Sequence, residues 1–373
     1  MKIVYCIAGI FNSGGMERVL SLKANYLVSQ GFDVTIITTD QDNRPPFFFL
    51  DNRIKLFDLN INYNPASNSI FLKAFSYIIK QNRHKRELRR LLSILKSDVV
   101  ISMFDHEVSV LPYINDGSKK ILEIHFSKFK RIQYNRKGVY YLIDYLRSLN
   151  DLRLAKKYDK FVVLTEEDKL NWGNLSNLIN IPNPNSFESS KISELNNKNV
   201  IAVGRLDYQK SFDELIIAWS KLDEKYDDWK LNIYGDGPLK DNLFELIKSL
   251  KLQNRVFINS VVKDIKEKYI ESSILAMTSK YEGLPMALLE GQVCGLPLVS
   301  YACKCGPRDI IKDGENGFLI SQGDVLSFKN ALEQLMEDYQ LRVFMGKNSV
   351  KLSEKYSMSN VMNQWINVFK EFS

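Results

Sequence analysis

Residues 181–199 read IPNPNSFESSKISELNNKN, and this stretch divides the chain. It is rich in Pro, Asn and Ser and poor in apolar residues, which is typical of a linker. On each side of it, short apolar runs alternate with longer amphipathic segments, the pattern of strands and helices in parallel α/β domains. A chain of 373 residues also exceeds what one hydrophobic core usually organises. The sequence therefore predicts two α/β domains that meet at this linker.

Each domain is expected to contain a doubly wound parallel sheet with helices between the strands. Such sheets bind ligands beyond the carboxyl ends of their strands, so two of them meeting at a linker predict a cleft. We predict an N-terminal domain over residues 1–183, a linker over 184–199, a C-terminal domain over 200–355 and a C-terminal helix within 356–373. The clearest helical patterns lie at residues 17–29 and 70–95. The predicted strands are residues 2–8, 34–38, 54–59, 99–103, 121–124 and 161–164 in the first domain and 200–203, 231–234, 256–258, 274–277, 298–301 and 317–320 in the second.

The composition indicates a soluble globular protein, with 45% hydrophobic and 25% charged residues. No stretch approaches the roughly 18 apolar residues of a membrane-spanning helix, and the N-terminus lacks a signal-peptide cleavage pattern. The four cysteines are too few and too unevenly spaced for a disulfide framework, and no Cys-x-x-Cys pair occurs. We therefore expect a cytoplasmic protein.

The net charge of +7 comes from the first half of the chain, where residues 1–190 contain 27 Lys and Arg against 19 Asp and Glu. Much of the excess lies in residues 80–96 and 119–137. Both clusters include Leu, Ile, Phe or Tyr, as in a helix lying on an anionic membrane, although a solvated basic face would have the same composition. His84 lies within the first cluster, and we expect it to be solvent-exposed. The chain has no nucleic-acid recognition motif or zinc-ligand spacing, which disfavours a nucleic-acid-binding protein.

Three features of the first domain are candidate sites. Gly14 and Gly15 follow the first predicted strand, where they suit either phosphate binding at a helix start or only a tight turn. His106 follows a strand end and suits a cleft or a loop equally well. Asp40 and Asp42 match a short metal-binding motif, but no Glu or His partners accompany them. We therefore expect no metal site.

The loop after the first strand of the second domain contains Gly204, Arg205 and, five residues beyond the arginine, Lys210. Arginine offers a planar fork of donors and lysine a mobile point charge. Two such cations at the carboxyl end of a strand suit a diphosphate that must be held and then stabilised as a leaving group.

Residues 281–290, YEGLPMALLE, form the most specific motif. Glu282 lies in the loop after a predicted strand, and Glu290 lies on the helix that begins near Pro285, a favourable first-turn residue. A carboxylate on a helix can accept hydrogen bonds from two ribose hydroxyls, while the N–H groups at the helix start can bind phosphate. The motif therefore predicts a nucleotide site.

Taken together and in this order, these motifs resemble the retaining GT-B glycosyltransferases of family 4, also called glycosyltransferases group 1, of the polysaccharide and lipid-linked oligosaccharide type. The resemblance covers nearly the whole chain. It includes YGDGP at residues 234–238, Asn183 at the interdomain link and DGENG at 313–317. It also implies two Rossmann-like domains facing across a cleft and a C-terminal helix that returns to the first domain.

The resemblance implies a role for each matching residue. Glu290 would bind the donor ribose, and Arg205 and Lys210 the diphosphate. Glu282 and His125 would be the catalytic residues beside the donor sugar. Many relatives have an acidic residue directly before that histidine, whereas Ile124 stands here and Glu123 comes one earlier, which leaves the role of Glu123 open. The remaining donor-binding positions would be Gly14, Gly15, Gly204, Gly235, Gly283, Leu284, Pro285 and Met286.

The implied activity is transfer of a hexose or N-acetylhexosamine from a nucleotide-sugar to a saccharide acceptor, in capsule, O-antigen or exopolysaccharide biosynthesis. Residues 305–311, CGPRDII, resemble a segment of polysaccharide-type members that use UDP-sugars. The family needs no metal or other cofactor. The acceptor would be lipid-linked, and the enzyme would be peripheral on the inner face of the membrane. A nucleotide-sugar epimerase with the same fold is the alternative.

Overall fold

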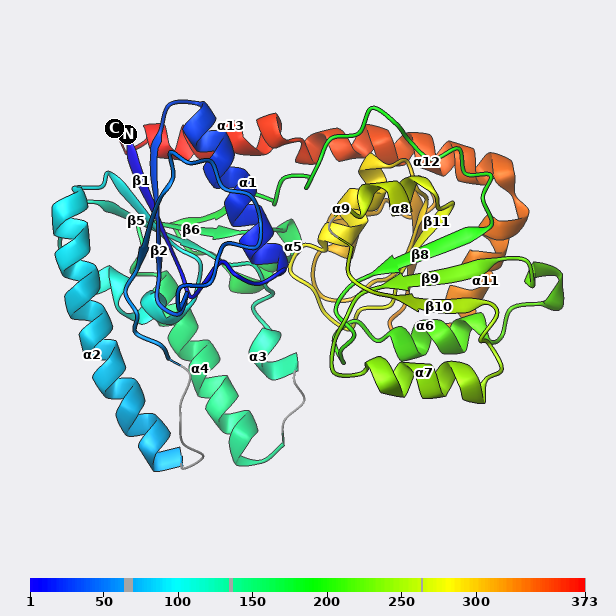
Figure 1. The fold of residues 1–373 in the computed structure, drawn as a ribbon, viewed down its shortest axis with the longest axis horizontal. Helices are drawn as coiled ribbons and strands as arrows, with labels where there is room; N and C mark the ends of the chain where they lie inside the picture. The colour runs from blue at the N-terminus through cyan, green and yellow to red at the C-terminus, as the bar shows by residue number, and fades with distance from the viewer. Residues whose placement is uncertain (64–69, 134–136, 263, 373) are drawn as a thin grey trace. The chain divides into compact units, whose positions relative to one another are not determined.

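The computed structural model describes residues 1–63, 70–133, 137–262 and 264–372. The chain folds into two compact units (Figure 1). The first contains Met1–Leu164, Asp168–Ile181 and Met362–Ser373, so the chain returns to it at its C-terminal end. The second contains Thr165–Glu167 and Pro182–Val361.

The first unit is built on a seven-stranded sheet in which every neighbouring pair is parallel. The six strands predicted here are present, with ends within two residues of the predicted ones. The seventh, at the sheet edge, has only three residues and was not predicted. In spatial order the strands are β3 Lys55–Asp58, β2 Asp33–Thr38, β1 Lys2–Ile7, β4 Val99–Ser102, β5 Lys119–Glu123, β6 Lys160–Val163 and β7 Leu178–Asn180.

Helices cover this sheet because its central strands are apolar on both faces. In β1, Val4 and Cys6 pack in one cluster with Leu88 and Leu92 of the long helix α2, while Tyr5 between them points to the opposite face. The helical segments are α1 Gly15–Ser29, α2 Ile70–Leu95, η1 His106–Ser109, η2 Leu111–Tyr113, α3 Lys130–Gln133, α4 Val139–Ala155, α5 Glu166–Trp172 and α13 Met358–Lys370.

The second unit contains a six-stranded sheet, again parallel throughout. All six of its strands were predicted. The strand order is β10 Val256–Asn259, β9 Lys230–Tyr234, β8 Asn199–Val203, β11 Ile274–Met277, β12 Leu298–Tyr301 and β13 Gly317–Ile320. The helical segments are α6 Phe212–Trp219, η3 Glu224–Tyr226, α7 Lys240–Ser249, α8 Lys266–Ile270, α9 Met286–Val293, α10 Pro307–Ile310, α11 Val325–Glu337, α12 Tyr339–Ser353 and η4 Glu354–Tyr356.

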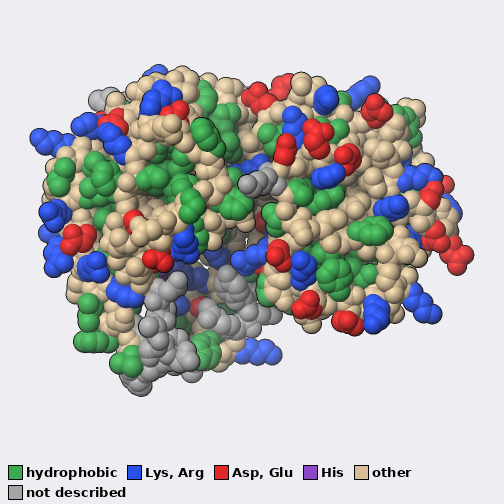
Figure 2. Space-filling model, in the orientation of Figure 1, with side chains coloured by type: hydrophobic (Ala, Val, Ile, Leu, Met, Phe, Trp, Pro, Cys, Tyr) green, Lys and Arg blue, Asp and Glu red, His purple; other side chains and the backbone are tan. Residues whose placement is uncertain are grey.

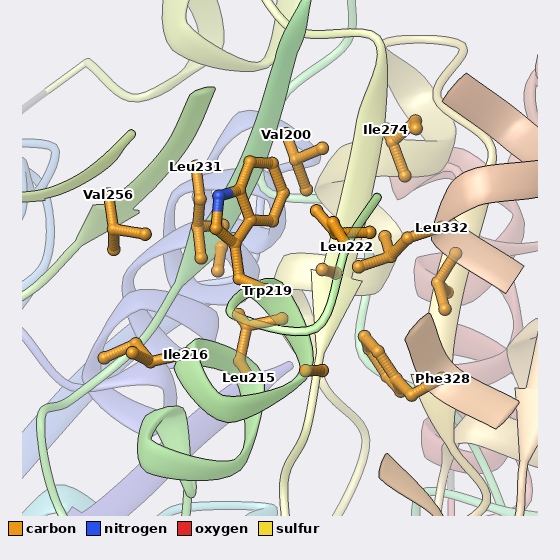
Figure 3. Packing of buried hydrophobic residues seen from close by; sticks show 14 of the residues in the cluster. Val200, Leu215, Ile216, Trp219, Leu222, Leu231, Val256, Ile274, Phe328 and Leu332 are labelled. Atoms are coloured by element: carbon orange, nitrogen blue, oxygen red, sulfur yellow. The ribbon is translucent and has the colours of Figure 1, made fainter. Parts of the chain in front are cut away.

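The largest buried side chain of the second unit is Trp219, at the end of α6. Figure 3 shows its indole beside Val200 of β8 and Leu231 of β9, with Phe328 of α11 further along the same cluster. All four side chains are fully buried, which anchors α6 and α11 to one face of the sheet. This packing holds the ends of the strands from which the loops of the second unit begin.

The C-terminal helix α13 packs on the first unit around a buried charge. The Nζ atom of Lys23 on α1 lies 2.6 and 2.7 Å from the two carboxylate oxygens of Glu123 at the end of β5. The same Nζ atom lies 3.6 Å from the ring centre of Trp365 on α13. One cation therefore links α1, β5 and α13 through an ion pair and a cation–π contact.

Within the described part of the chain, no helix has both the length and the apolar composition that crossing a membrane requires.

We expect Lys23→Met to lower the free energy of unfolding by about 3–5 kcal/mol, because it leaves the buried Glu123 carboxylate without its counter-ion. The double substitution Lys23→Met with Glu123→Gln removes both charges and should restore most of the loss. Lys55→Met is the matched control, since Lys55 forms an exposed pair with Asp33 and its loss should cost at most about 1 kcal/mol. Urea denaturation measures all three variants. Equal destabilisation by the Lys23 and Lys55 substitutions would contradict this account.

Candidate active site

The strand order of the second unit reverses between β8 and β11. The chain proceeds from β8 outward through β9 to β10, and from β11 outward through β12 to β13. The loops after β8 and β11 therefore diverge from adjacent strands, and open α/β sheets bind ligands at such a reversal. Gly204, Arg205 and Lys210 follow β8, and residues 282–286 follow β11. The structure therefore brings these predicted site residues to one place.

Close backbone packing requires glycine at Gly235, and the Lys210 side chain lies close to the Cα atom of Gly204. A Cβ atom on Gly235, just after β9, would lie 1.9 Å from the carbonyl oxygen of Gly204. A Cβ atom on Gly204 would lie 2.9 Å from Cε of Lys210, whose aliphatic chain crosses over this position. Glycine at both positions lets the loop after β8 lie flat against its neighbour and directs the lysine toward β11.

Arg205 and Lys210 are both organised by Asp207, a residue that the sequence analysis did not single out. The Nη2 atom of Arg205 lies 2.6 Å from Oδ2 of Asp207, and the backbone N–H of Lys210 donates to its Oδ1 atom at 3.2 Å. The Arg205 side chain remains 73% exposed. Its planar guanidinium is therefore oriented at the surface with donors open to a ligand.

Lys210 and Glu282 form an ion pair across the strand reversal. The Nζ atom of Lys210 lies 2.7 Å from Oε1 of Glu282, and the two side chains are 18% and 8% exposed. Gln209 donates to the carbonyl oxygen of Tyr281 at 3.0 Å, and the N–H of Lys280 donates to the carbonyl oxygen of Gln209 at 2.8 Å. These bonds join the loop after β8 to the loop after β11. The cation and the carboxylate are thus partly desolvated, which strengthens the electrostatic interaction of either with a ligand.

The Glu282 loop is also supported by the segment that follows β12. The backbone N–H of Glu282 donates to the carbonyl oxygen of Lys304 at 2.8 Å. Gly306 has φ of +95°, and a Cβ atom on it would lie 2.8 Å from the carbonyl oxygen of Gly283 and 2.5 Å from Cδ of Pro285. Glycine is therefore required at this position. The backbone from Gly283 through Leu284 and Pro285 is held against it and leads into α9.

Helix α9 begins at Met286 with Pro285 as its N-cap, so its first N–H groups follow directly after the Glu282 loop. Helix starts have unpaired N–H groups and a partial positive charge, which favour anions.

Burial, with the nearby negative charge of Glu282 as a second cause, raises the pKa of the Cys303 thiol. This cysteine is therefore a neutral packing residue and not a candidate nucleophile.

Glu290 is buried on α9, and protein hydroxyls contact both of its carboxylate oxygens. Ser186 donates to Oε1 at 2.7 Å, and Tyr269 of α8 donates to Oε2 at 2.8 Å. Neither residue was identified from the sequence. Ser186 lies in the polar stretch expected to be a linker, and Tyr269 belongs to no motif. Each carboxylate oxygen can accept two hydrogen bonds, which makes this group a suitable acceptor for hydroxyls.

The strand order of the first unit reverses between β1 and β4. Gly14 is the N-cap of α1 and Gly15 is its first residue, so both lie at the helix start after β1, as predicted. A Cβ atom on Gly14 would lie 2.2 Å from a carboxylate oxygen of Glu17 in the first turn. Burial raises the pKa of Glu17, which favours its neutral form at this helix start.

Two acids and a histidine follow β4 at the same reversal. Asp105 Oδ2 accepts a hydrogen bond from the backbone N–H of Ala8 at 2.7 Å, which ties the ends of β4 and β1 together. Burial raises the pKa of Glu107 to about 8, and the nearby charge of Asp105 contributes to this rise. His106 stacks on Tyr63 with ring centres 3.7 Å apart, and burial lowers the pKa of this histidine. It is therefore part of a packed aromatic cluster and not of an isolated loop.

His125 lies two residues beyond the end of β5. Its Nε2 atom lies at an ion-pair distance of 3.1 Å from Oε1 of Glu123, but within the described residues neither ring nitrogen has a hydrogen bond of good geometry. Burial alone would raise the pKa of Glu123, but the charge of Lys23 and the contact with His125 lower it to about 2. The carboxylate therefore stays ionised beside the imidazole. The sequence left the role of Glu123 open, and the structure places its carboxylate between Lys23 and His125.

The prediction that His84 is solvent-exposed is wrong. The side chain is 1% exposed, and its Nδ1 atom lies 2.9 Å from the hydroxyl of Tyr63. Burial lowers the pKa of His84 to about 4, with a smaller contribution from His106. His84 therefore belongs to the buried face of α2, with Leu88 and Leu92 one and two turns further on.

Within the described residues, no group of three His, Cys, Asp or Glu side chains is arranged to hold a metal ion. Asp40 accepts hydrogen bonds from the side chain of Thr39 and the backbone of Tyr63. Asp42 has φ of +54°, typical of a turn. Both acids of the short motif therefore shape the loop after β2.

Comparisons with known proteins identify relatives over the whole chain. Residues 185–352 match the family model described as glycosyl transferases group 1. A glycosyltransferase of Haemophilus influenzae is 32% identical over 98% of both chains. The amylovoran biosynthesis glycosyltransferase AmsD of Erwinia amylovora is 30% identical, also over 98% of both chains. An N-acetylgalactosaminyltransferase of Campylobacter jejuni, whose name specifies a saccharide-PP-undecaprenol, is 28% identical over 100% of this chain and 99% of its own.

Among solved structures, S. aureus TarM in complex with UDP and α-GlcNAc-glycerol superimposes with a TM-score of 0.79, covering 99% of each chain at 17% identity. The shared architecture is the GT-B fold, as predicted. The relatives favour a transferase over an epimerase of the same fold. With two relatives at 30% identity or more over almost its full length, the chain belongs to the group 1 glycosyltransferases.

Proposed function

We propose that the protein is a retaining glycosyltransferase that moves a hexose or N-acetylhexosamine from a UDP-sugar to a saccharide acceptor in polysaccharide biosynthesis. The observation that carries the proposal is the Lys210–Glu282 pair at the strand reversal, with Arg205 open to solvent beside it. These groups suit a diphosphate next to a polar sugar. The UDP named in the TarM complex supports the choice of nucleotide.

In the proposed reaction, an acceptor hydroxyl attacks C1 of the donor sugar from the face that the diphosphate leaves. The C1–O bond to the diphosphate breaks, the new C1–O bond forms on the same face, and the departing phosphate oxygen takes the hydroxyl proton. Arg205, Lys210 and the N–H groups at the start of α9 stabilise the negative charge that develops on the leaving group. The protein therefore needs no metal for this step.

Glu282 would orient the donor sugar and hold Lys210 in place. Its carboxylate accepts from Lys210 at 2.7 Å and has further lone pairs for sugar hydroxyls. Glu290 would accept the two ribose hydroxyls, in addition to the hydroxyls of Ser186 and Tyr269. This division gives the two glutamates different ligands.

The first unit would bind the acceptor and complete the donor site. Gly14 and Gly15 would approach the phosphates at the start of α1, and His125, which lies beside Glu123, would contact the sugar near C1. We propose a lipid-linked acceptor, as the name of the Campylobacter relative specifies for that protein. The enzyme would then act at the cytoplasmic face of a membrane.

The basic clusters of the first unit support membrane binding to different extents. In the cluster at residues 119–137, Lys119 pairs with Asp159 and the buried Lys120 pairs with Asp116. Residues 134–136 of this cluster lie outside the described residues. In the cluster at 80–96, Arg83, Arg89 and Arg90 are exposed on α2. Charge for an anionic surface therefore comes mainly from α2.

Arg205→Ala should weaken UDP binding by about tenfold to a hundredfold, because it removes a charge-assisted hydrogen bond to the diphosphate. Stability should not change, since the side chain is exposed. Arg53→Ala is the matched control: Arg53 is also exposed and also pairs with an aspartate two residues away. Isothermal titration with UDP compares the variants, and unchanged affinity of the Arg205 variant would refute its assignment to the diphosphate.

Glu282→Gln should lower kcat by about a hundredfold or more and leave UDP affinity within a few-fold, because the lost charge acts on the sugar and on Lys210. Glu333→Gln controls for loss of a partly buried Lys–Glu pair, since Glu333 pairs with Lys329 at 2.6 Å on α11. Single-turnover transfer from UDP-sugar measures the effect. Full activity of the Glu282 variant would exclude the proposed role.

A panel of UDP-, GDP- and ADP-sugars should show donor hydrolysis and thermal stabilisation with UDP-sugars, and both should persist in EDTA. NMR of the glycoside product should show the anomeric configuration of the donor. Loss of activity in EDTA would contradict the metal-independent mechanism. Isomerised sugar nucleotide without any glycoside would show an epimerase instead.

A further inference from the structure

Large apolar side chains are exposed at the beginnings of two helices of the first unit. In the first turns of α2, Leu72, Phe75 and Ile78 are 58%, 65% and 59% exposed. Helix α4 exposes Leu142 and Leu146 at 56% and 55%. We call these residues and their neighbours the helix-tip surface; the other members are Tyr77, Ile79, Tyr140, Tyr141, Ile143, Tyr145 and Leu149.

The pattern on α4 is unusual for a helix that covers a sheet. Residues 140–143 are four successive exposed apolar or aromatic positions, and at about 100° per residue they point in all directions around the helix axis. A helix covering a sheet shows one apolar stripe and a polar opposite face. The beginning of α4 therefore exposes apolar side chains in several directions, and at Asp144, which is 2% exposed, it turns a polar side chain inward.

Topology places both tips at the edge of the sheet that carries the candidate site. Helix α2 starts after β3 and leads into β4, and α4 starts after β5 and leads into β6. The helix in a parallel βαβ unit begins at the carboxyl edge of the sheet. Figure 1 shows both helices extending in the same direction, with their first turns beyond the sheet. Asp105 and His125 follow strands at this same edge.

The charges beside the tips favour an anionic surface. The sequence of α2 contains seven Lys and Arg against one Glu, and Arg83 and Arg86 on it are exposed. Lys137 and Arg147 are exposed at and near the start of α4. Figure 2 shows hydrophobic side chains at the lower end of the first unit, with Lys and Arg side chains nearby. Tyrosines, aliphatic side chains and flanking cations together are typical of helices at the membrane–water interface.

A second copy of the chain fits this surface less well. A twofold interface places the same patch on both partners, so the strongly basic α2 would belong to both sides of the contact. The like charges would then repel, whereas anionic lipid headgroups would neutralise them. The occupant therefore has to be negatively charged on its surface and apolar beneath it.

We propose that the beginnings of α2 and α4 insert into the headgroup region of an anionic bilayer and so hold the carboxyl edge of the first sheet at the membrane. The proposal deepens the lipid-linked acceptor of the proposed function and rests on it. An acceptor anchored in the membrane would present its saccharide at the edge that carries His125. The apolar side chains at the beginnings of α2 and α4 would insert into the bilayer, and the arginines of α2 would attract its anionic headgroups.

The test is cosedimentation of the full chain with vesicles of phosphatidylcholine alone or mixed with phosphatidylglycerol. The wild type should bind the mixed vesicles. The triple variant Tyr141→Ser, Leu142→Ser and Leu146→Ser should bind about tenfold more weakly or less, because three apolar side chains no longer leave water. The matched control replaces three exposed apolar residues away from the tips, Leu170→Ser, Leu326→Ser and Phe344→Ser, and should bind like the wild type.

Equal binding by the triple variant and the wild type would overturn the proposal, as would a wild type that binds no anionic vesicle. A wild type that is dimeric by size exclusion, with a monomeric triple variant, would identify the surface as a contact between copies and also overturn it. An assay of UDP-sugar hydrolysis without vesicles tests the proposed function separately from membrane insertion. If the wild type hydrolyses no UDP-sugar, the proposed function is refuted. If the triple variant hydrolyses UDP-sugar but no longer binds vesicles, the result supports the insertion.

Discussion

Parallel pairing in both sheets is the constraint on which the rest of this structure depends. It places every strand's carboxyl end on one edge of its sheet, so residues far apart in sequence gather wherever the strand order reverses. Lys210 and Glu282 are 72 residues apart and form an ion pair because β8 and β11 are neighbours. The bond from Ala8 to Asp105 joins β1 and β4 for the same reason. The loops carry the chemistry, but the sheets decide which loops meet.

The buried charge of Glu123 is paired and connected to several elements of the first unit. Glu123 contacts Lys23 and His125, and that lysine also lies over Trp365 of the last helix. An isolated buried carboxylate would become protonated, whereas this one keeps a pKa of about 2. A carboxylate that stays charged can hold a neighbouring imidazole in one orientation. The packing of α13 on the first unit is therefore coupled to the geometry around His125.

The fold was accessible from the sequence because strands buried on both faces are nearly continuous apolar runs, such as Ile274–Met277. The three-residue β7 lacks such a run, so nothing distinguished it from a loop. The donor motifs were also accessible, but their partners were not. Ser186 and Tyr269 reach Glu290 through tertiary contacts that no local pattern records, and Asp207 contacts Arg205 and Lys210 within one loop that has no regular pattern. The error at His84 had a signal. His84, Leu88 and Leu92 repeat every four residues, and this helical period outweighs the basic residues between them.

The two glutamates of the 281–290 motif differ because their surroundings differ. Glu290 lies on a buried helix and accepts hydrogen bonds from the hydroxyls of Ser186 and Tyr269, the kind of donor that a ribose also offers. Glu282 forms an ion pair with Lys210, and a ligand phosphate that drew this lysine away would leave the carboxylate less neutralised beside the sugar. One ion pair would then respond to both halves of a nucleotide-sugar. Under the proposed function, an electrostatic link of this kind would let the leaving group and the sugar be stabilised together by side chains alone.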